Sequence, residues 1–241
     1  METTLKEKLI ALAAKYETSD FLPNDPSQFM HRYSIPQHQE RAGFIASALS
    51  YGSRKQFIPK IDYLLSVDKV LGNGKSLPDN EECFYRLHTN KMLKKFLSTL
   101  DAIEVEYGSL GEMMQKENIT TCIDAIKLLT GYFADHNASD LIPKNANSAC
   151  KRVCMFMRWM VRDNSAVDLG LWSKQIDKST LIMPMDTHVL QEAKKLGLIK
   201  SSSGSMATAI KLTNRLKEIF PEDPTKADFA LFGLGVDDEE E

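Results

Sequence analysis

Apolar residues recur along most of the chain at the spacing of one face of an α-helix. Five stretches show this most clearly, with apolar side chains one, three, four or seven positions apart. They are Leu5, Leu9, Leu12 and Ala13; Ala42, Ile45, Ala46 and Leu49; Leu93, Phe96, Leu97, Leu100 and Ile103; Cys122, Ala125, Ile126, Leu129 and Phe133; and Ala209, Leu212, Leu216 and Ile219. Alternating runs of β-branched residues are missing. The pattern predicts an all-α protein with about ten helices.

Clusters of proline, asparagine, serine and aspartate separate these stretches, at residues 23–26, 77–80, 143–147 and 201–205. The acidic run 237–241 is predicted to be a disordered tail.

The chain has 241 residues, 43% of them hydrophobic, which suits one large domain or two modest lobes. Its apolar stretches are shorter than the ~20 residues of a membrane span, and its first residues do not resemble a signal peptide. We therefore expect a cytoplasmic protein without a membrane partner. The cysteines are Cys83, Cys122, Cys150 and Cys154, and without an export signal they are predicted to be reduced thiols that form neither a disulfide nor a zinc site. No cofactor is expected.

Net charge is a poor guide to partners here, because the charges are unevenly distributed. The formal charge of −3 becomes +2 for residues 1–236 once the five acids of the tail are set aside. Residues 141–175 carry six cations and two acids, a local charge of +4. A positive segment of this kind is typical of a surface that faces phosphates.

The predicted helix over residues 148–162 concentrates this charge. Its apolar positions share one face, and Lys151, Arg158 and Arg162 fall within about 60° of one another on the opposite face. The candidate DNA contacts in and near this helix are Lys144, Arg152, Arg158, Trp159 and Arg162. A solvated cationic face is the alternative, and Trp159 would then pack against a second lobe instead of stacking on a base.

Lys151 lies in the first turn of that helix, and its position suits a nucleophile. A free lysine is almost wholly protonated near neutrality, so a nucleophilic one needs its charged form disfavoured. The positive end of the helix dipole and the neighbouring Arg152 would both act in that direction. An ordinary surface lysine near a helix start is the alternative.

Asp186 follows Pro184 and precedes an amphipathic segment, so it is predicted to be the N-cap of a helix. Capping alone would explain this residue. A capping carboxylate is also held rigidly, and it can still face a cleft.

The segment Leu181–Val189, with its Asp186-Thr187-His188 core, resembles the "V-D-T-H-V/I" segment of the helix-hairpin-helix DNA glycosylase and AP lyase superfamily. The resemblance implies an all-α fold of two lobes with a cleft between them, with residues 36–165 as a central lobe and residues 1–35 with 166–236 as a second one. It assigns Asp186 as the catalytic carboxylate. It also implies that Lys151 is the lysine that attacks the sugar C1′. The spacing of these two residues is similar to that in the archaeal 8-oxoguanine glycosylase branch.

The same resemblance places Ser53, Arg54 and Gln56 at the DNA cleft and makes His188 and Trp172 auxiliary candidates. The whole chain also resembles a bacterial family of unassigned function. Two departures stand out. Residues 142–148 replace the glycine-containing hairpin, and the C-terminal cysteines of an iron-sulfur cluster are missing, so no such cluster is expected.

These observations predict a DNA base-excision glycosylase, with AP lyase activity if Lys151 forms a Schiff base. It would bind backbone phosphates and a base flipped out of the duplex. Two alternatives stay open: a catalytically silent nucleic-acid-binding module, and a helical protein-interaction domain that uses Arg158 and Trp159.

Overall fold

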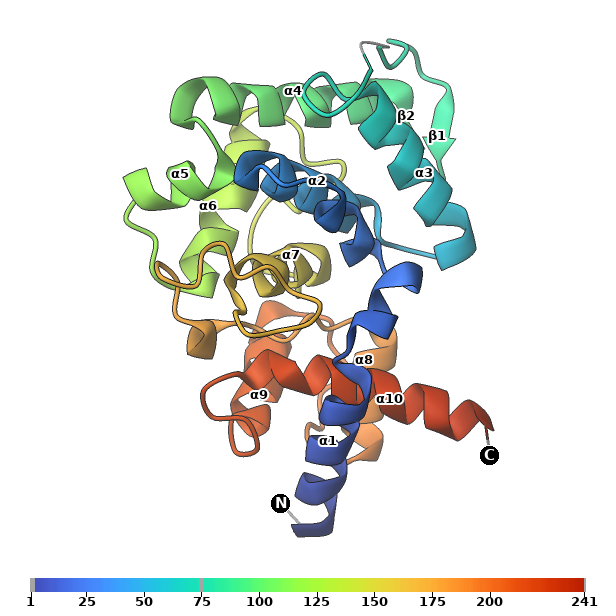
Figure 1. Ribbon diagram of the computed structural model, residues 1–241, viewed down its shortest axis with the longest axis vertical. Coiled ribbons are helices and arrows are strands. Elements are labelled where there is room, and N and C mark those ends of the chain that lie inside the picture. Colours follow the sequence, from blue (N-terminus) through green and yellow to red (C-terminus); the bar gives the residue numbers. More distant parts are fainter. Residues whose placement is uncertain (1–2, 74–75, 241) are drawn as a thin grey trace. The chain divides into compact units, whose positions relative to one another are not determined.

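The computed structural model describes residues 3–73 and 76–240, and within them the chain is built almost entirely from helices. These residues form ten α-helices and four 3₁₀ helices, and the only sheet among them has two short antiparallel strands. The predicted all-α class is confirmed. The chain divides into two compact units, which are described separately, and Figure 1 labels their elements.

Unit 1 comprises Met1–Leu22, Thr121–Ile123 and Ala146–Glu241. Its elements are α1 (Thr3–Tyr16), most of the 3₁₀ helix η1 (Ser19–Asn24), α7 (Lys151–Val161), η3 (Lys178–Thr180), α8 (Thr187–Lys195), α9 (Met206–Leu216), η4 (Pro224–Lys226) and α10 (Ala227–Glu240). Residues 237–240, predicted to be disordered, belong to the last helix, and Glu241 lies outside the described residues.

In unit 1, α1 packs across α10 (Figure 1). The predicted stripe on α1 is buried at Leu9 and Leu12. The ring of Tyr16 meets that of Phe232 edge to face, with centroids 5.6 Å apart. Gly233 lies so close to the Tyr16 ring that a Cβ built on it would be 2.3 Å from a ring carbon. The absence of a side chain at Gly233 therefore allows the two helices to approach each other.

Unit 2 comprises Pro23–Thr120 and Asp124–Asn145. Its elements are η2 (Pro26–Arg32), α2 (Pro36–Leu49), α3 (Arg54–Val67), β1 (Cys83–Tyr85), β2 (His88–Thr89), α4 (Asn90–Tyr107), α5 (Leu110–Lys116) and α6 (Cys122–Asp135), of which residues 122 and 123 group with unit 1. The predicted central lobe of residues 36–165 thus overlaps most of unit 2, but residues 146–165 lie in unit 1.

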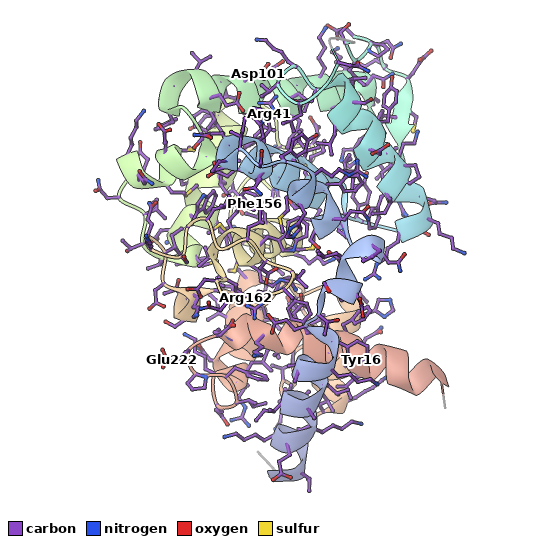
Figure 2. The ribbon with its side chains drawn as sticks, in the orientation of Figure 1. Tyr16, Arg41, Asp101, Phe156, Arg162 and Glu222 are labelled. Carbon is purple, nitrogen blue, oxygen red and sulfur yellow. The ribbon has the colours of Figure 1, made fainter. Side chains whose placement is uncertain are left out.

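The core of unit 2 combines an aromatic cluster with a buried cation. Phe44 stacks on Phe96 at 5.8 Å between centroids, and both contact Phe133. Arg41 on α2 is 2% exposed and pairs with Asp68 and Asp101 at 2.7 Å each (Figure 2). Burial alone would lower the pKa of Arg41, but the hydrogen bond and charge of Asp68, together with the charges of Glu104 and Asp101, raise it.

Two further observations concern the described part of the chain. No helix within residues 3–73 and 76–240 has both the length and the apolar character needed to cross a bilayer. No group of three or more His, Cys, Asp or Glu side chains is arranged there to hold a metal ion.

Candidate active site

Lys151 and Asp186 come together in unit 1, each at the start of a helix. Lys151 is the first residue of α7, and Asp186 is the N-cap residue of α8. The Nζ atom of Lys151 lies 3.6 Å from Oδ2 of Asp186, with exposed fractions of 32% and 39% for the two side chains. The pair is therefore an ion pair that solvent, and any molecule of suitable shape, can reach.

The two carboxylate oxygens of Asp186 have different partners. Oδ1 accepts a hydrogen bond of 2.9 Å from the backbone N–H of Val189, which caps α8 as the sequence predicted. Oδ2 faces the amine of Lys151. Capping therefore fixes the orientation of the carboxylate while leaving one oxygen directed at the amine, so the structural role and a chemical role are compatible in one side chain.

Lys151 is positioned by the segment that precedes α7. Cys150 has a left-handed backbone, with φ of +46°, and turns the chain into the helix. The preceding residues are held by the loop between α8 and α9: the N–H of Ala149 donates to the carbonyl of Gly204, and that of Met206 donates to the carbonyl of Asn147, both at 2.9 Å. Two backbone hydrogen bonds thus fix the approach to the helix start on which Lys151 lies.

The neighbours of Lys151 differ in exposure. Arg152 is half-buried, and Cys150 is buried. Burial raises the pKa of the Cys150 thiol, while the hydroxyl of Ser148 and the charge of Arg152 act in the opposite direction. His188 is exposed on α8, two residues after Asp186, and its auxiliary role stays a prediction.

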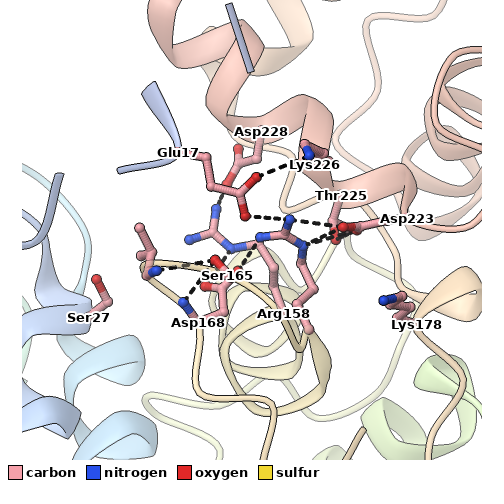
Figure 3. Close-up of polar contacts among 12 residues, drawn as sticks. Glu17, Ser27, Arg158, Ser165, Asp168, Lys178, Asp223, Thr225, Lys226 and Asp228 are labelled. Atoms are coloured by element: carbon pink, nitrogen blue, oxygen red, sulfur yellow. Dashed lines mark hydrogen bonds and ion pairs between the residues drawn. The ribbon is translucent and has the colours of Figure 1, made fainter. Parts of the chain in front are cut away.

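Arg158 and Arg162 do not form the predicted DNA-facing surface. Their side chains are 3% and 2% exposed, and Figure 3 shows Arg158 inside a cluster of carboxylates. Arg158 pairs with Asp228 and with Asp168, and Arg162 pairs with Asp168, Asp223 and Glu17. Both guanidinium groups are neutralised within unit 1, so the prediction that they hold phosphates is wrong.

This cluster is a structural centre of unit 1. Arg162 donates to both oxygens of Asp223, at 3.0 and 2.9 Å, and to Glu17 at 2.7 Å. It thereby links α7 to the segment after α1 and to the segment before η4. Burial alone would lower the pKa of Arg162, but the surrounding carboxylates, Asp168 foremost, raise it above its usual range.

The two tryptophans of the chain are also interior. Trp159 is fully buried, and its carbonyl accepts hydrogen bonds from the N–H groups of Leu169 and Gly170, at 2.8 and 3.2 Å. Trp172 is 4% exposed and packs edge to face on Phe156, with centroids 5.3 Å apart. Neither ring can stack on an exposed base, so the prediction that Trp159 binds DNA is wrong, and the auxiliary role of Trp172 stays a prediction. The interaction surface proposed for Arg158 and Trp159 is excluded for the same reason.

The remaining candidates lie in unit 2 and are exposed. Lys144 follows α6, and Ser53, Arg54 and Gln56 lie at the N-terminus of α3, where Ser53 is the N-cap residue without a capping hydrogen bond from its side chain. Their exposure is compatible with DNA binding, and their role stays a prediction. The connection between α6 and α7 spans residues 136–150, so the tight glycine turn of a helix-hairpin-helix has no counterpart there.

The sequence did not single out a surface cavity of about 390 Å³ in unit 1. Lys200, Lys211 and Arg215 line it together with Ser201, which belongs to the serine-rich cluster 201–205 that the sequence marked only as a separator between helices. The available sequence signal for this cavity was its three cations. They were not recognised as a group because one follows α8 and the other two lie on or near α9.

The comparisons with known proteins give a family and no activity. No curated protein and no solved structure matches the chain. A family model described as "Protein of unknown function (DUF2400)" matches residues 25–237, which is most of the chain and includes both Lys151 and Asp186. The chain therefore belongs to the DUF2400 family.

Proposed function

We propose that this protein is a DNA base-excision glycosylase with AP lyase activity, acting at the sugar of a damaged nucleotide. The observation that carries the proposal is the 3.6 Å approach of the Lys151 amine to the Asp186 carboxylate, with both groups accessible to solvent. A nucleophile within reach of an acid or base is the arrangement that covalent catalysis at a sugar carbon requires.

The chemistry follows from the pair. Asp186 accepts a proton from the Lys151 ammonium, which frees the amine, and passes this proton to the base as it departs, so that Asp186 is a carboxylate again. The amine attacks C1′, and the bond between C1′ and the base breaks with its electron pair leaving on the base. Loss of a proton and opening of the sugar ring then give an iminium between C1′ and Nζ. Removal of a proton from C2′ breaks the bond from C3′ to its phosphate, which cleaves the strand.

The carboxylate has a second part in this scheme. As the base departs, positive charge develops at C1′ and the ring oxygen, as in glycoside cleavage. A carboxylate whose orientation is fixed by the cap of α8 stabilises that charge without reorganising. Extruding the nucleotide from the duplex costs a few kcal/mol of unstacking and unpairing. This cost is smallest for a damaged base, so damaged bases are favoured as substrates.

The proposal includes kinship with the helix-hairpin-helix glycosylase superfamily, supported by the resemblance of residues 181–189 and by the helical fold. Residues 136–150 depart from its hairpin. In this reading Arg152 and the exposed residues Lys144, Ser53, Arg54 and Gln56 remain the candidate contacts to DNA, and His188 remains auxiliary.

The test is covalent trapping. The protein is incubated with duplexes that carry an abasic site or an oxidised purine, and borohydride is added to reduce the iminium. The proposal predicts a protein–DNA adduct for the wild type and its loss in Lys151→Ala. Lys174→Ala is the matched control, because Lys174 is an exposed lysine of the same unit that lies outside the pair.

Equal adduct yields in Lys151→Ala and the control would contradict the assignment of the nucleophile. Absence of both adduct and base release across a panel of lesions would contradict the enzymatic function. In that case, salt-sensitive DNA binding that survives Asp186→Asn would identify a catalytically silent nucleic-acid-binding module.

A further inference from the structure

The 390 Å³ cavity of unit 1 has two chemically different walls. One is apolar and consists of Leu198 and Ile199, which are 5% and 9% exposed. The other consists of polar and cationic side chains, namely Lys200, Ser201, Thr208, Lys211, Asn214 and Arg215. Cavities of this size, apolar on one side and with convergent polar groups on the other, are the usual form of ligand sites.

The charge of this cavity is strongly one-sided. Three cations line it, and none of its lining residues is acidic. Arg215 pairs with Glu218 at 2.5 Å. Among the described residues, neither Lys200 nor Lys211 forms an ion pair, in contrast to Arg158 and Arg162 in the same unit. Two lysines whose charge is not compensated face one cavity, which therefore attracts an anion.

A hydrogen bond links the two hydroxyl groups that line the cavity. Ser201 Oγ and Thr208 Oγ1 are 3.1 Å apart, and Ser205 Oγ lies 3.1 Å from the same Thr208 oxygen. This chain of hydroxyls ties the loop after α8 to the first turn of α9. The loop therefore holds Lys200 and Ser201 in place next to the lysine on α9.

The same loop contacts the approach to the candidate active site. Gly204 and Met206 form the two backbone hydrogen bonds to residues 147 and 149, just before Lys151. Ser148 and Ser205 pair as an isolated antiparallel bridge. One wall of the cavity and the start of α7 thus belong to one hydrogen-bonded segment of unit 1.

We propose that this cavity binds a phosphodiester of the DNA strand, with the adjoining deoxyribose against Leu198 and Ile199. Lys200 and Lys211 hold the phosphate oxygens, and the apolar wall receives the sugar carbons. The identity of the ligand as DNA rests on the proposed function. The cavity is then a binding subsite that positions the strand and takes no part in the chemistry at C1′.

The experiment compares two double variants of equal charge. Lys200→Gln/Lys211→Gln removes both cavity lysines, and Lys174→Gln/Lys195→Gln removes two exposed lysines of unit 1 outside the cavity. Binding to an abasic-site duplex is measured by fluorescence anisotropy over a range of salt concentrations. Thermal unfolding checks that both variants fold, and dAMP is titrated separately as a free nucleotide.

Each phosphate contact contributes about 0.9 to the slope of log affinity against log salt, which is roughly eightfold in affinity at 0.1 M salt. The cavity variant should therefore bind DNA about tenfold more weakly than the control variant, with a slope reduced by about one. At saturating DNA its borohydride adduct should reach the wild-type yield, because Lys151 is intact.

Equal DNA affinities and slopes for the two variants would overturn the inference, whether or not the wild type forms an adduct. Micromolar binding of dAMP that the cavity variant loses, with DNA binding unchanged, would also overturn it and would assign the cavity to a free nucleotide. The expected loss of DNA binding in a protein that forms no adduct would leave the subsite standing and contradict the lyase instead.

Discussion

Asp186 can serve both as a helix cap and as a chemical group, and the sequence alone does not distinguish these two roles. Its Oδ1 caps α8 through Val189, and its Oδ2 faces Lys151. Asparagine caps a helix as well as aspartate does, but it has no charge. Alanine provides neither the cap nor the charge. Substitution at this position therefore distinguishes a carboxylate needed for chemistry from one needed for the helix.

Asp186→Asn should unfold at nearly the wild-type temperature, while Asp186→Ala should lose about 1 kcal/mol of stability through the missing cap. Both should lose most base release, because the charge that stabilises the transition state is gone. Denaturant unfolding and a glycosylase assay on the two variants measure this. Wild-type activity in Asp186→Asn would show that Asp186 serves only as a cap.

The cysteines give a second test at individual positions. Cys83 is exposed, whereas Cys122 and Cys154 are buried, and burial raises the pKa of Cys122 to about 12. Because only the thiolate is nucleophilic, the Cys122 thiol is unreactive near neutrality. Iodoacetamide at pH 8 should modify Cys83 alone in the native protein and all four cysteines in denaturant, as read by mass spectrometry. Rapid native labelling of Cys122 would contradict the burial described for it.

The helix α7 shows what the sequence could predict of an element and what it could not. Its position and its apolar face were predicted correctly, because hydrophobic periodicity reports them directly. Its other face, at Arg158 and Arg162, is buried as well. The carboxylates that neutralise this face, on Glu17, Asp223 and Asp228, come from distant parts of the chain, and periodicity contains no information on which charges meet.

Arg162→Ala should therefore act on stability rather than on DNA contacts. Removing one partner from a buried ion pair leaves uncompensated charge, which costs about 3–5 kcal/mol. Lys174→Ala, at an exposed position of the same unit, should change stability by less than about 0.5 kcal/mol. Urea unfolding compares the two. A normally stable Arg162→Ala protein with weakened DNA binding would instead support the original prediction of a phosphate contact.

The pairing of α1 with α10 depends on one missing side chain. A Cβ at Gly233 would lie 2.3 Å from a ring carbon of Tyr16, so one of the two helices must shift to accept it. Overpacking of this kind typically costs about 1–3 kcal/mol. Gly233→Ala should lower stability by that amount, and Gly233→Ala/Tyr16→Ala should recover part of the loss in the same unfolding assay. No loss in the single variant would contradict the close packing.

For the molecule as a whole, the chain divides into two units whose membership differs from that of the predicted lobes, because residues 146–165 lie in unit 1. The clusters of proline, asparagine and aspartate at residues 23–26 and 143–147 coincide with places where the chain passes from one unit to the other. Residues 146–165 nevertheless belong with α10 and α1, because the carboxylates that satisfy α7 are there. Such clusters indicate where helices end, but they do not show which helices share a core.

The electrostatics of the molecule change with this assignment. The predicted local charge of +4 over residues 141–175 included Arg158 and Arg162, whose charges are compensated inside unit 1. Any attraction to DNA must therefore come from other cations, among them Lys151, Arg152 and the cavity lysines Lys200 and Lys211. The polar pair that the sequence did predict, Lys151 with Asp186, was recoverable because each residue begins a helix and lies in a recognisable segment.

Locating the covalent bond tests the central claim most directly. The wild type is trapped with borohydride on an abasic-site duplex, digested with nuclease and protease, and its peptides are analysed by tandem mass spectrometry. We predict the mass of the reduced sugar fragment on Nζ of Lys151 and on no other amine. The same fragment on a different lysine or on the N-terminal amine, with Lys151 unmodified, would contradict the account.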